Sequence, residues 1–249
     1  MISDSAARTH ITSRDGVSPV APARNGILAG LPESELAAFL ERAEEVEFPS
    51  RSELFQPGEP IQSVYFPLSG MISMVIVLKD GTMIEAITVG KEGFTGAPVV
   101  NDVHTSRYRG VCQVAGRFLS IEASGLIEVL ESAPILERKL RHYVQYASDV
   151  TGQSAACNSI HTIEQRSARW LLVTADAVGT TEFSLTQEFL SQMLAVRRPG
   201  VNVAMRALSR RALISHRYGK VSILDLVGLR QASCECYATI SEKAAELLE

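Results

Sequence analysis

The sequence predicts an α+β protein with an N-terminal jelly-roll β domain, one long central helix and a C-terminal winged helix-turn-helix. Three patterns favour this fold class. Short strand-like segments separated by glycine turns fill residues 46–122, and a single apolar stripe at helical spacing follows in residues 134–160. Residues 196–220 then carry seven Lys or Arg side chains and no acidic one, although the formal net charge of the 249 residues is -4.

The first 26 residues mix Ser, Thr, Pro, Gly and Arg without periodicity, so we expect residues 1–26 to form a flexible arm. They lack the continuous apolar segment of a signal peptide, and no stretch reaches the roughly 20 apolar residues of a transmembrane helix. We therefore expect a cytoplasmic protein with no membrane partner. A short amphipathic helix is predicted next, from Leu36, Phe39, Leu40 and Ala43.

Residues 27–131 are expected to form the β domain. β-Branched and aromatic residues gather in segments 64–66, 71–78, 83–89 and 111–121. Turn residues separate these segments, at Pro57-Gly58, Ser69-Gly70, Asp80-Gly81, Gly90 and Gly93. Many short strands without alternating helices favour a sandwich or jelly roll over a parallel sheet.

A long helix is predicted over residues 132–160, with Pro134 in its first turn. Its apolar side chains step by three and four along the chain, at Ile135, Leu136, Leu140, Tyr143, Val144, Ala147, Val150, Cys157 and Ile160. Such a stripe is longer than one small domain needs to bury, so a symmetric homodimer is the economical hypothesis. The alternative is that the stripe packs wholly against its own β domain.

Residues 161–234 are expected to form a winged helix-turn-helix, followed by a C-terminal tail over residues 235–249. A leading helix is predicted over residues 162–177, and Gly179 closes it. Thr186 suits the N-cap of a short second helix. Pro199 suits the first turn of a third helix, where its missing N–H has no partner to lose.

This third helix is both amphipathic and basic. One face carries the apolar residues Val201, Ala204, Met205 and Leu208, and another carries Arg198, Asn202, Arg206 and Arg210. Residues 213–214 and 221–223 then predict two strands around a basic hairpin that turns at Gly219. A basic helix alone is more often only a solvated face. The cap, the short turn, the proline and the hairpin together favour a DNA-binding winged helix.

The distribution of charge and of metal-ligating side chains favours binding to a polyanion over metal binding or catalysis. Residues 162–231 hold ten Lys or Arg against five Asp or Glu, whereas residues 1–161 hold thirteen against nineteen, so one part of the chain suits a polyanion. Cys234 and Cys236 alone do not complete a tetrahedral site, and we expect no metal and no cofactor. A cupin-like metalloenzyme is the alternative from another class. Only His104 of the five histidines lies in the β region, so we expect no enzyme activity.

The order of domains and three local strings resemble the Crp/Fnr family of bacterial transcription regulators. These strings are YFPLSG at residues 65–70, GKEG at 90–93 and LTQEFLSQML at 185–194. The resemblance covers residues 28–233 and is most specific in the helix-turn-helix. It implies a β domain of cyclic-nucleotide-binding type that controls a homodimer. That dimer would dock on a two-fold-symmetric double-stranded DNA operator, with RNA polymerase as a further partner.

The resemblance also implies which side chains meet DNA. By position, Arg197, Arg198 and Asn202 match the part of the recognition helix that faces base edges, and Arg206 is a fourth candidate. Arginine can bind guanine bidentately and asparagine adenine, which suits base reading. The candidates for phosphate contacts are Thr186, Gln187, Arg210, Arg217 and Lys220. Pro199 stands where the family often has an acidic base-contacting residue, so the operator sequence does not carry over.

The expected sensor departs from the members of the family that bind cyclic AMP. Those members resemble each other in a Gly-Glu pair for the ribose and an Arg-Ser or Arg-Thr pair for the phosphate. Around Gly96-Ala97-Pro98 the glutamate is absent, and residues 101–107 contain no such arginine pair. No cysteine precedes Cys112, so the N-terminal cluster of the iron-sulfur members is absent as well. We expect no response to cyclic AMP, and the effector and its pocket stay unknown. A ligand-independent regulator is the alternative.

Overall fold

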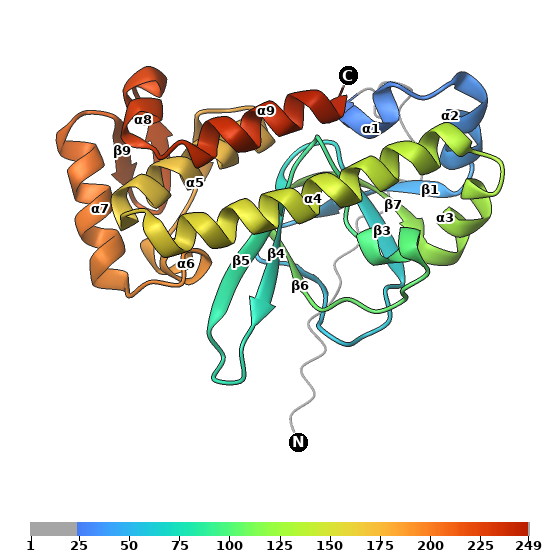
Figure 1. The fold of residues 1–249 in the computed structure, drawn as a ribbon, viewed down its shortest axis with the longest axis horizontal. Coiled ribbons are helices and arrows are strands. Elements are labelled where there is room, and N and C mark those ends of the chain that lie inside the picture. The colour runs from blue at the N-terminus through green and yellow to red at the C-terminus, as the bar shows by residue number, and fades with distance from the viewer. Residues whose placement is uncertain (1–23, 249) are drawn as a thin grey trace.

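The computed structural model describes residues 24–248 and shows a β domain and a winged helix-turn-helix connected by one long helix (Figure 1). Residues 1–23 of the predicted arm lie outside the described residues. The end of that arm is structured, because Asn25 is fully buried and caps helix α1 (Gly26–Ala29). The Asn25 side-chain amide donates to the carbonyls of Pro67 and Gly93, at 3.2 and 2.9 Å. These contacts fix the chain to the β domain before residue 27.

Two antiparallel sheets form the β domain, which confirms the jelly-roll fold class. One sheet has the order β1-β7-β3, from β1 (Ala43–Phe48), β7 (Gly116–Glu122) and β3 (Ser63–Pro67). The other has the order β2-β6-β4-β5, from β2 (Glu53–Phe55), β6 (Arg109–Val114), β4 (Met71–Val77) and β5 (Met83–Val89). Strands β1 and β2 were not resolved in the sequence pattern. The segment predicted as one strand over 111–121 divides into β6 and β7 at Ala115.

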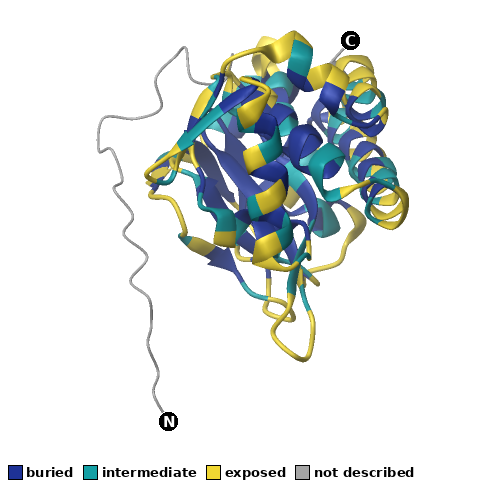
Figure 2. Cartoon of the chain, turned by 90° about the vertical axis from the view of Figure 1, so that its left-hand side faces the viewer, coloured by how far each residue is buried: buried dark blue, intermediate teal, exposed yellow. Residues whose placement is uncertain are grey.

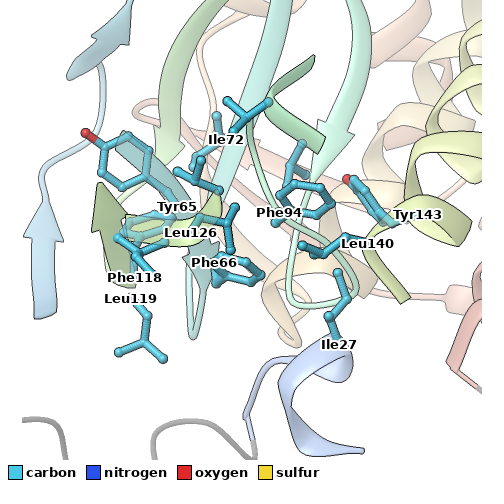
Figure 3. Packing of buried hydrophobic residues seen from close by; sticks show 14 of the residues in the cluster. Ile27, Tyr65, Phe66, Ile72, Phe94, Phe118, Leu119, Leu126, Leu140 and Tyr143 are labelled. Atoms are coloured by element: carbon cyan, nitrogen blue, oxygen red, sulfur yellow. The ribbon is translucent and has the colours of Figure 1, made fainter. Parts of the chain in front are cut away.

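Aromatic and aliphatic side chains pack together in the core of the β domain (Figure 3). The rings of Phe66 and Phe94 stack with centroids 5.4 Å apart, and Phe94 meets Tyr143 of the long helix at 5.1 Å. Besides α1, the helices of this domain are α2 (Glu33–Leu40), η2 (Ala97–Asn101) and α3 (Ala123–Leu130). The long helix therefore belongs to the core of the β domain as much as to the connection between domains.

Gly93 packs directly against the Tyr143 side chain of the long helix. It ends a turn in which the Gly93 N–H donates to the Gly90 carbonyl at 3.1 Å, and a Cβ at this position would overlap the Tyr143 ring. We expect Gly93→Ala to destabilise the protein by about 1 to 3 kcal/mol, because the buried ring has no room to move. Urea unfolding measures this change. Gly30→Ala is the matched control, since its added methyl meets only the flexible end of Lys139. Equal stability of the two variants would contradict the packing described here.

The long helix α4 (Pro134–Ile160) packs along a helix from the C-terminus (Figure 1). The predicted C-terminal tail forms this helix, α9 (Cys236–Leu248), and Lys243 Nζ lies 2.9 Å from Asp149 Oδ2 of α4. Most of the predicted apolar stripe of α4 is buried within the chain, at Leu136, Leu140, Tyr143, Val150 and Cys157 together with the nearby Tyr146, whereas Ile160 is 78% exposed. The β domain and α9 therefore cover these residues, and no partner chain is needed to bury them.

The C-terminal domain is a winged helix-turn-helix, as predicted. Helix α5 (Ile163–Val178) begins at a capping box formed by Thr162 and Gln165 and ends at Gly179, whose φ is 71°. The other elements are β8 (Glu182–Ser184), α6 (Gln187–Met193), α7 (Arg198–Arg210), β9 (Ile214–Arg217), β10 (Lys220–Ile223) and α8 (Leu226–Ala232). The three strands form one small sheet in the order β8-β10-β9.

The winged domain packs on the β4–β5 hairpin of the β domain. Trp170 Nε1 of α5 donates to Glu85 Oε1 of β5 at 2.8 Å, and burial at this contact raises the pKa of Glu85. Met71 and Val75 of β4 belong to the same buried cluster as the core of the winged domain. Figure 2 shows the chain from the side of the winged domain, with each residue coloured by its burial. Among the described helices, none is long and apolar enough to cross a membrane.

Candidate nucleic-acid interface

Two short helices and a tight turn present the candidate interface. The Thr186 hydroxyl accepts from the Phe189 N–H at 3.2 Å and begins α6, which confirms the predicted N-cap. Ala195, with a φ of 50°, turns the chain before α7. Arg197 is the N-cap residue of α7 and Pro199 lies in its first turn, so α7 begins where the sequence predicts.

The buried stripe of α7 fixes which side of the helix faces outward. Val201, Ala204, Met205 and Leu208 are at most 3% exposed and pack on the core of the winged domain. The side chains of Arg197, Arg198, Arg206 and Arg210 are exposed, and Asn202 is half-buried among them. The structure thus brings the four predicted base-reading residues and Arg210 together on one outward surface, which we call the basic face of α7.

The arginines of the basic face have no carboxylate partner in residues 24–248. No ion pair involves Arg197, Arg198, Arg206 or Arg210 within that range. Arg211 differs, because its Nη1 lies 3.1 Å from Glu164 Oε1. Cations that are exposed and not neutralised by their own chain are available to phosphates and base edges.

The wing extends this basic surface. Strands β9 and β10 pair with Arg217 opposite Lys220, and Tyr218 and Gly219 form the two-residue turn with φ values of 51° and 72°. Positive φ at both positions is typical of a type I′ hairpin, which confirms the predicted turn at Gly219. Arg217 and Lys220 therefore stand at the tip of the wing, and neither forms an ion pair in the described part of the chain.

The first residues of α6 lie next to the wing. The Leu185 N–H donates to the Gly219 carbonyl at 2.8 Å, which connects the start of α6 to the hairpin turn. Gln187 Nε2 lies 3.4 Å from His216 Nδ1 of β9, so its amide is held at the helix N-terminus. Thr186 and Gln187, both candidates for phosphate contacts, are thus placed beside Arg217 and Lys220.

Two exposed side chains on this surface escaped the sequence analysis. Val203 of α7 is 67% exposed and projects beside Arg206, and Tyr218 at the wing tip is fully exposed. The signal for Val203 was its position outside the apolar stripe of α7, since an apolar residue on a polar face needs a reason. Apolar side chains on a recognition helix can contact the methyl group of thymine.

The β domain has a cavity between η2, β5 and α4. It holds about 420 Å³, and its lining contains no charged side chain among the described residues. Aromatic and small side chains dominate this lining, including Phe94, Tyr108 and Tyr143. Arg109 is engaged elsewhere, with Nη1 3.5 Å from Glu53 Oε1 and Nε 3.0 Å from Gln56, and Arg107 is exposed on the surface. A phosphate in this cavity would have no cationic partner.

The glycine-rich turn at residues 90–93 does not form an anion site. The Glu92 carboxylate accepts from the Gly90 N–H at 2.8 Å, and burial raises the pKa of this carboxyl. The backbone donor of the turn is therefore occupied by the chain's own acidic group. The structure thus has the turn that Gly90 and Gly93 predict.

The basic face of α7, supported by its buried stripe and flanked by a basic wing, defines a DNA-binding regulator of the winged-helix class. Residues 165–232 match the family model of the Crp-like helix-turn-helix domain, and residues 45–133 match that of the cyclic nucleotide-binding domain. The chain belongs to the Crp/Fnr family and is a DNA-binding transcription regulator with a sensor domain of the cyclic-nucleotide-binding type.

Known proteins with similar sequence and structure agree with this family. The CRP-like cAMP-activated global transcriptional regulator of Mycobacterium tuberculosis is 26% identical over 212 residues, which cover 82% of this chain and 94% of that protein. The global regulator CLP of Xanthomonas campestris, described as responsive to c-di-GMP, has a TM-score of 0.64 at 16% identity and covers 77% of this chain and 99% of its own. A Crp/Fnr-family regulator from Eubacterium rectale has a TM-score of 0.64 at 13% identity, covering 84% and 98%. These relatives are regulators rather than enzymes.

Proposed function

We propose that the protein acts as a homodimer on an inverted-repeat operator, with one α7 helix in the major groove of each half-site. The basic face of α7 carries this proposal, because its exposed arginines, which form no ion pair within residues 24–248, surround an asparagine. Two such helices related by a two-fold axis would enter successive major grooves roughly 34 Å apart. DNA as the target implies action in the cytoplasm, and RNA polymerase is the expected partner there.

A second face of α4 supports the homodimer. The residues of α4 that remain exposed between positions 148 and 160 are small or apolar. They are Ser148, Gly152, Ala155, Ala156, Ser159 and Ile160, of which Ile160 is 78% exposed. The last charged side chain of α4 is Asp149, which is held by Lys243. Small side chains let two helix backbones approach closely, and an uncharged face loses little on leaving water. We call this surface the open face of α4.

Hydroxyl-radical footprinting tests the proposed geometry. A dimer that reads two half-sites protects two segments on one side of the duplex, with centres about one helical turn apart. The full-length protein and a duplex that it binds tightly are the reagents. A single protected segment, or protection without a two-fold pattern, would contradict a symmetric operator.

Lys220 is expected to contribute to the affinity for DNA without choosing a base sequence. Lys220 stands at the wing tip, where it can neutralise a phosphate and release counterions, so Lys220→Ala should weaken binding to all sequences alike. The slope of log affinity against log salt should fall in magnitude by about 1 per subunit. Titrations at several salt concentrations on operator and random duplexes measure this change. A loss confined to the operator would contradict a phosphate contact.

The proposal for the effector rests on the cavity between η2, β5 and α4. Since it lacks charged lining residues, we propose that cyclic AMP does not bind there in the manner expected of cyclic-AMP-binding members, and that any effector is a mostly uncharged molecule. A regulator that needs no ligand remains the alternative. Thermal unfolding with a panel of metabolites distinguishes the two, because a ligand that binds only the folded state raises the melting temperature. Stabilisation by cyclic AMP would contradict the first proposal.

A further inference from the structure

Four metal-ligating side chains converge where α4, α8 and α9 meet. Cys157 lies in the last turn of α4 and His161 caps that helix, whereas Cys234 lies between α8 and α9 and Cys236 is the first residue of α9. One ligand atom from each residue lies within 4.8 Å of all the others. The Sγ atoms of Cys157 and Cys234 are 3.5 Å apart, and Cys236 Sγ is 3.6 Å from His161 Nδ1.

We propose that Cys157, His161, Cys234 and Cys236 bind one zinc-class divalent ion in a tetrahedral site. With Zn–S bonds of about 2.3 Å and Zn–N bonds of about 2.0 Å, a tetrahedral centre separates its ligand atoms by roughly 3.5 to 3.8 Å. Both measured separations fall at this spacing. Thiolates with imidazole select zinc over harder cations, and four protein ligands are typical of a structural site rather than a catalytic one.

The expectation of no metal rested on Cys234 and Cys236 having no further ligands. The fold supplies the two further ligands, Cys157 and His161, from the end of α4. Cys157 is 77 positions from Cys234 along the chain. All four cysteines of the protein are free, so no disulfide competes for these sulfur atoms. The three cysteines of the site are at most 4% exposed, which keeps water away from the metal.

Outer contacts orient the ligands as metal sites require. Glu235 Oε2 lies 3.1 Å from His161 Nε2, and a proton on that nitrogen leaves Nδ1 with its lone pair toward Cys236. Ligating histidines commonly donate their other N–H to a carboxylate in this way. Gln153 Nε2 donates to Cys236 Sγ at 3.1 Å, a contact that favours a thiolate.

Two buried arginines offset the charge of such a site. Arg166 and Arg169 are 6% and 8% exposed, and the Nε of each has no hydrogen-bond partner among the described residues. Three thiolates, a neutral imidazole and a divalent cation leave one net negative charge, which gives these cations a partner.

The position of the site suggests what the metal does. Cys157 and His161 end the long helix, whereas Cys234 and Cys236 follow α8 of the winged domain, so the ion would join both sides of the domain junction. Arg166, beside the site, also donates to the Leu194 carbonyl at the end of α6. Metal binding would thus hold α9 and the winged domain in a fixed relation to α4.

Metal analysis of the full-length protein, purified under reducing conditions, tests this proposal without any DNA. We expect about one zinc per chain. Cobalt substituted for the zinc should give the visible bands of a tetrahedral ion and thiolate charge transfer. Cys236→Ser should lose the metal, and Glu235→Ala should weaken its affinity about 10- to 100-fold by freeing His161. His161→Cys should retain a tetrahedral cobalt spectrum with stronger charge transfer.

Cys112→Ala is the matched control. Cys112 is equally buried but lies in β6, far along the chain from the site, and burial raises the pKa of its thiol to about 12. This variant should keep its zinc. Folded, reduced wild-type protein that binds neither zinc nor cobalt would overturn the proposal, as would a Cys157–Cys234 disulfide in freshly isolated protein. Metal retained by Cys236→Ser would place the site elsewhere and also overturn it.

Discussion

Replacing Arg198 by alanine should weaken operator binding by about 1 to 3 kcal/mol, roughly 5- to 150-fold, and flatten the preference at one base pair in each half-site. Arg198 is exposed at the start of α7, and no carboxylate of the described residues neutralises it. Removal of a bidentate arginine costs more on the correct base than on others, so specificity falls with affinity. Competition titrations at fixed salt, with each base pair of a half-site varied in turn, measure both effects.

Arg211→Ala is the control for charge alone. Arg211 follows α7 directly, but its guanidinium pairs with Glu164 at 3.1 Å and is not predicted to meet DNA. Loss of an exposed ion pair costs little folding stability, so the winged domain should stay intact. This variant should therefore bind the operator with an affinity within about twofold of wild type. If Arg198→Ala left discrimination unchanged, or if both variants lost the same affinity, the assignment of base-reading residues would be wrong.

Ala155→Glu should separate the homodimer and reduce operator affinity by on the order of 100-fold or more. Ala155 is exposed on the open face of α4, and two-fold symmetry would place two new carboxylates near each other in an uncharged interface. A monomer binds only one half-site. It therefore loses the increase in affinity that comes from binding both half-sites at once, which is often about 10²- to 10⁴-fold. Sedimentation velocity reports the oligomeric state, and titration of the same sample reports the affinity.

Ala37→Glu is the matched control for this substitution. Ala37 is exposed on α2, which is also helical but lies on the β domain away from α4's open face. The control should remain dimeric and keep its operator affinity. A dimeric Ala155→Glu with wild-type affinity would show that the open face of α4 is not the interface between subunits.

The candidate interface could be predicted because its signals are local. The Thr186 cap, the proline in the first turn of α7 and the spacing of Val201 to Leu208 depend on residues only a few positions apart. Gly219 likewise predicts the hairpin turn, because this turn requires a positive φ that glycine adopts readily. Short-range geometry decides each of these features, so the sequence pattern contains them.

Features that depend on distant parts of the chain were missed or misjudged. The stripe of α4 indicated a partner helix, and nothing in its spacing could tell α9 of the same chain from a second chain. Cys157 and Cys234 are 77 positions apart, and only the packing of α9 on α4 brings them together. Strands β1 and β2 carry weak alternation because charged residues such as Glu44, Glu45 and Glu53 interrupt it.

Selection of bound DNA from a random pool by the full-length protein is the most direct test of the central claim, that paired α7 helices read a symmetric operator. The selected sequences should converge on an inverted repeat whose half-site centres lie about one helical turn, 10 to 10.5 base pairs, apart. A pool that remains random, or a single asymmetric site bound by a monomer, would contradict it.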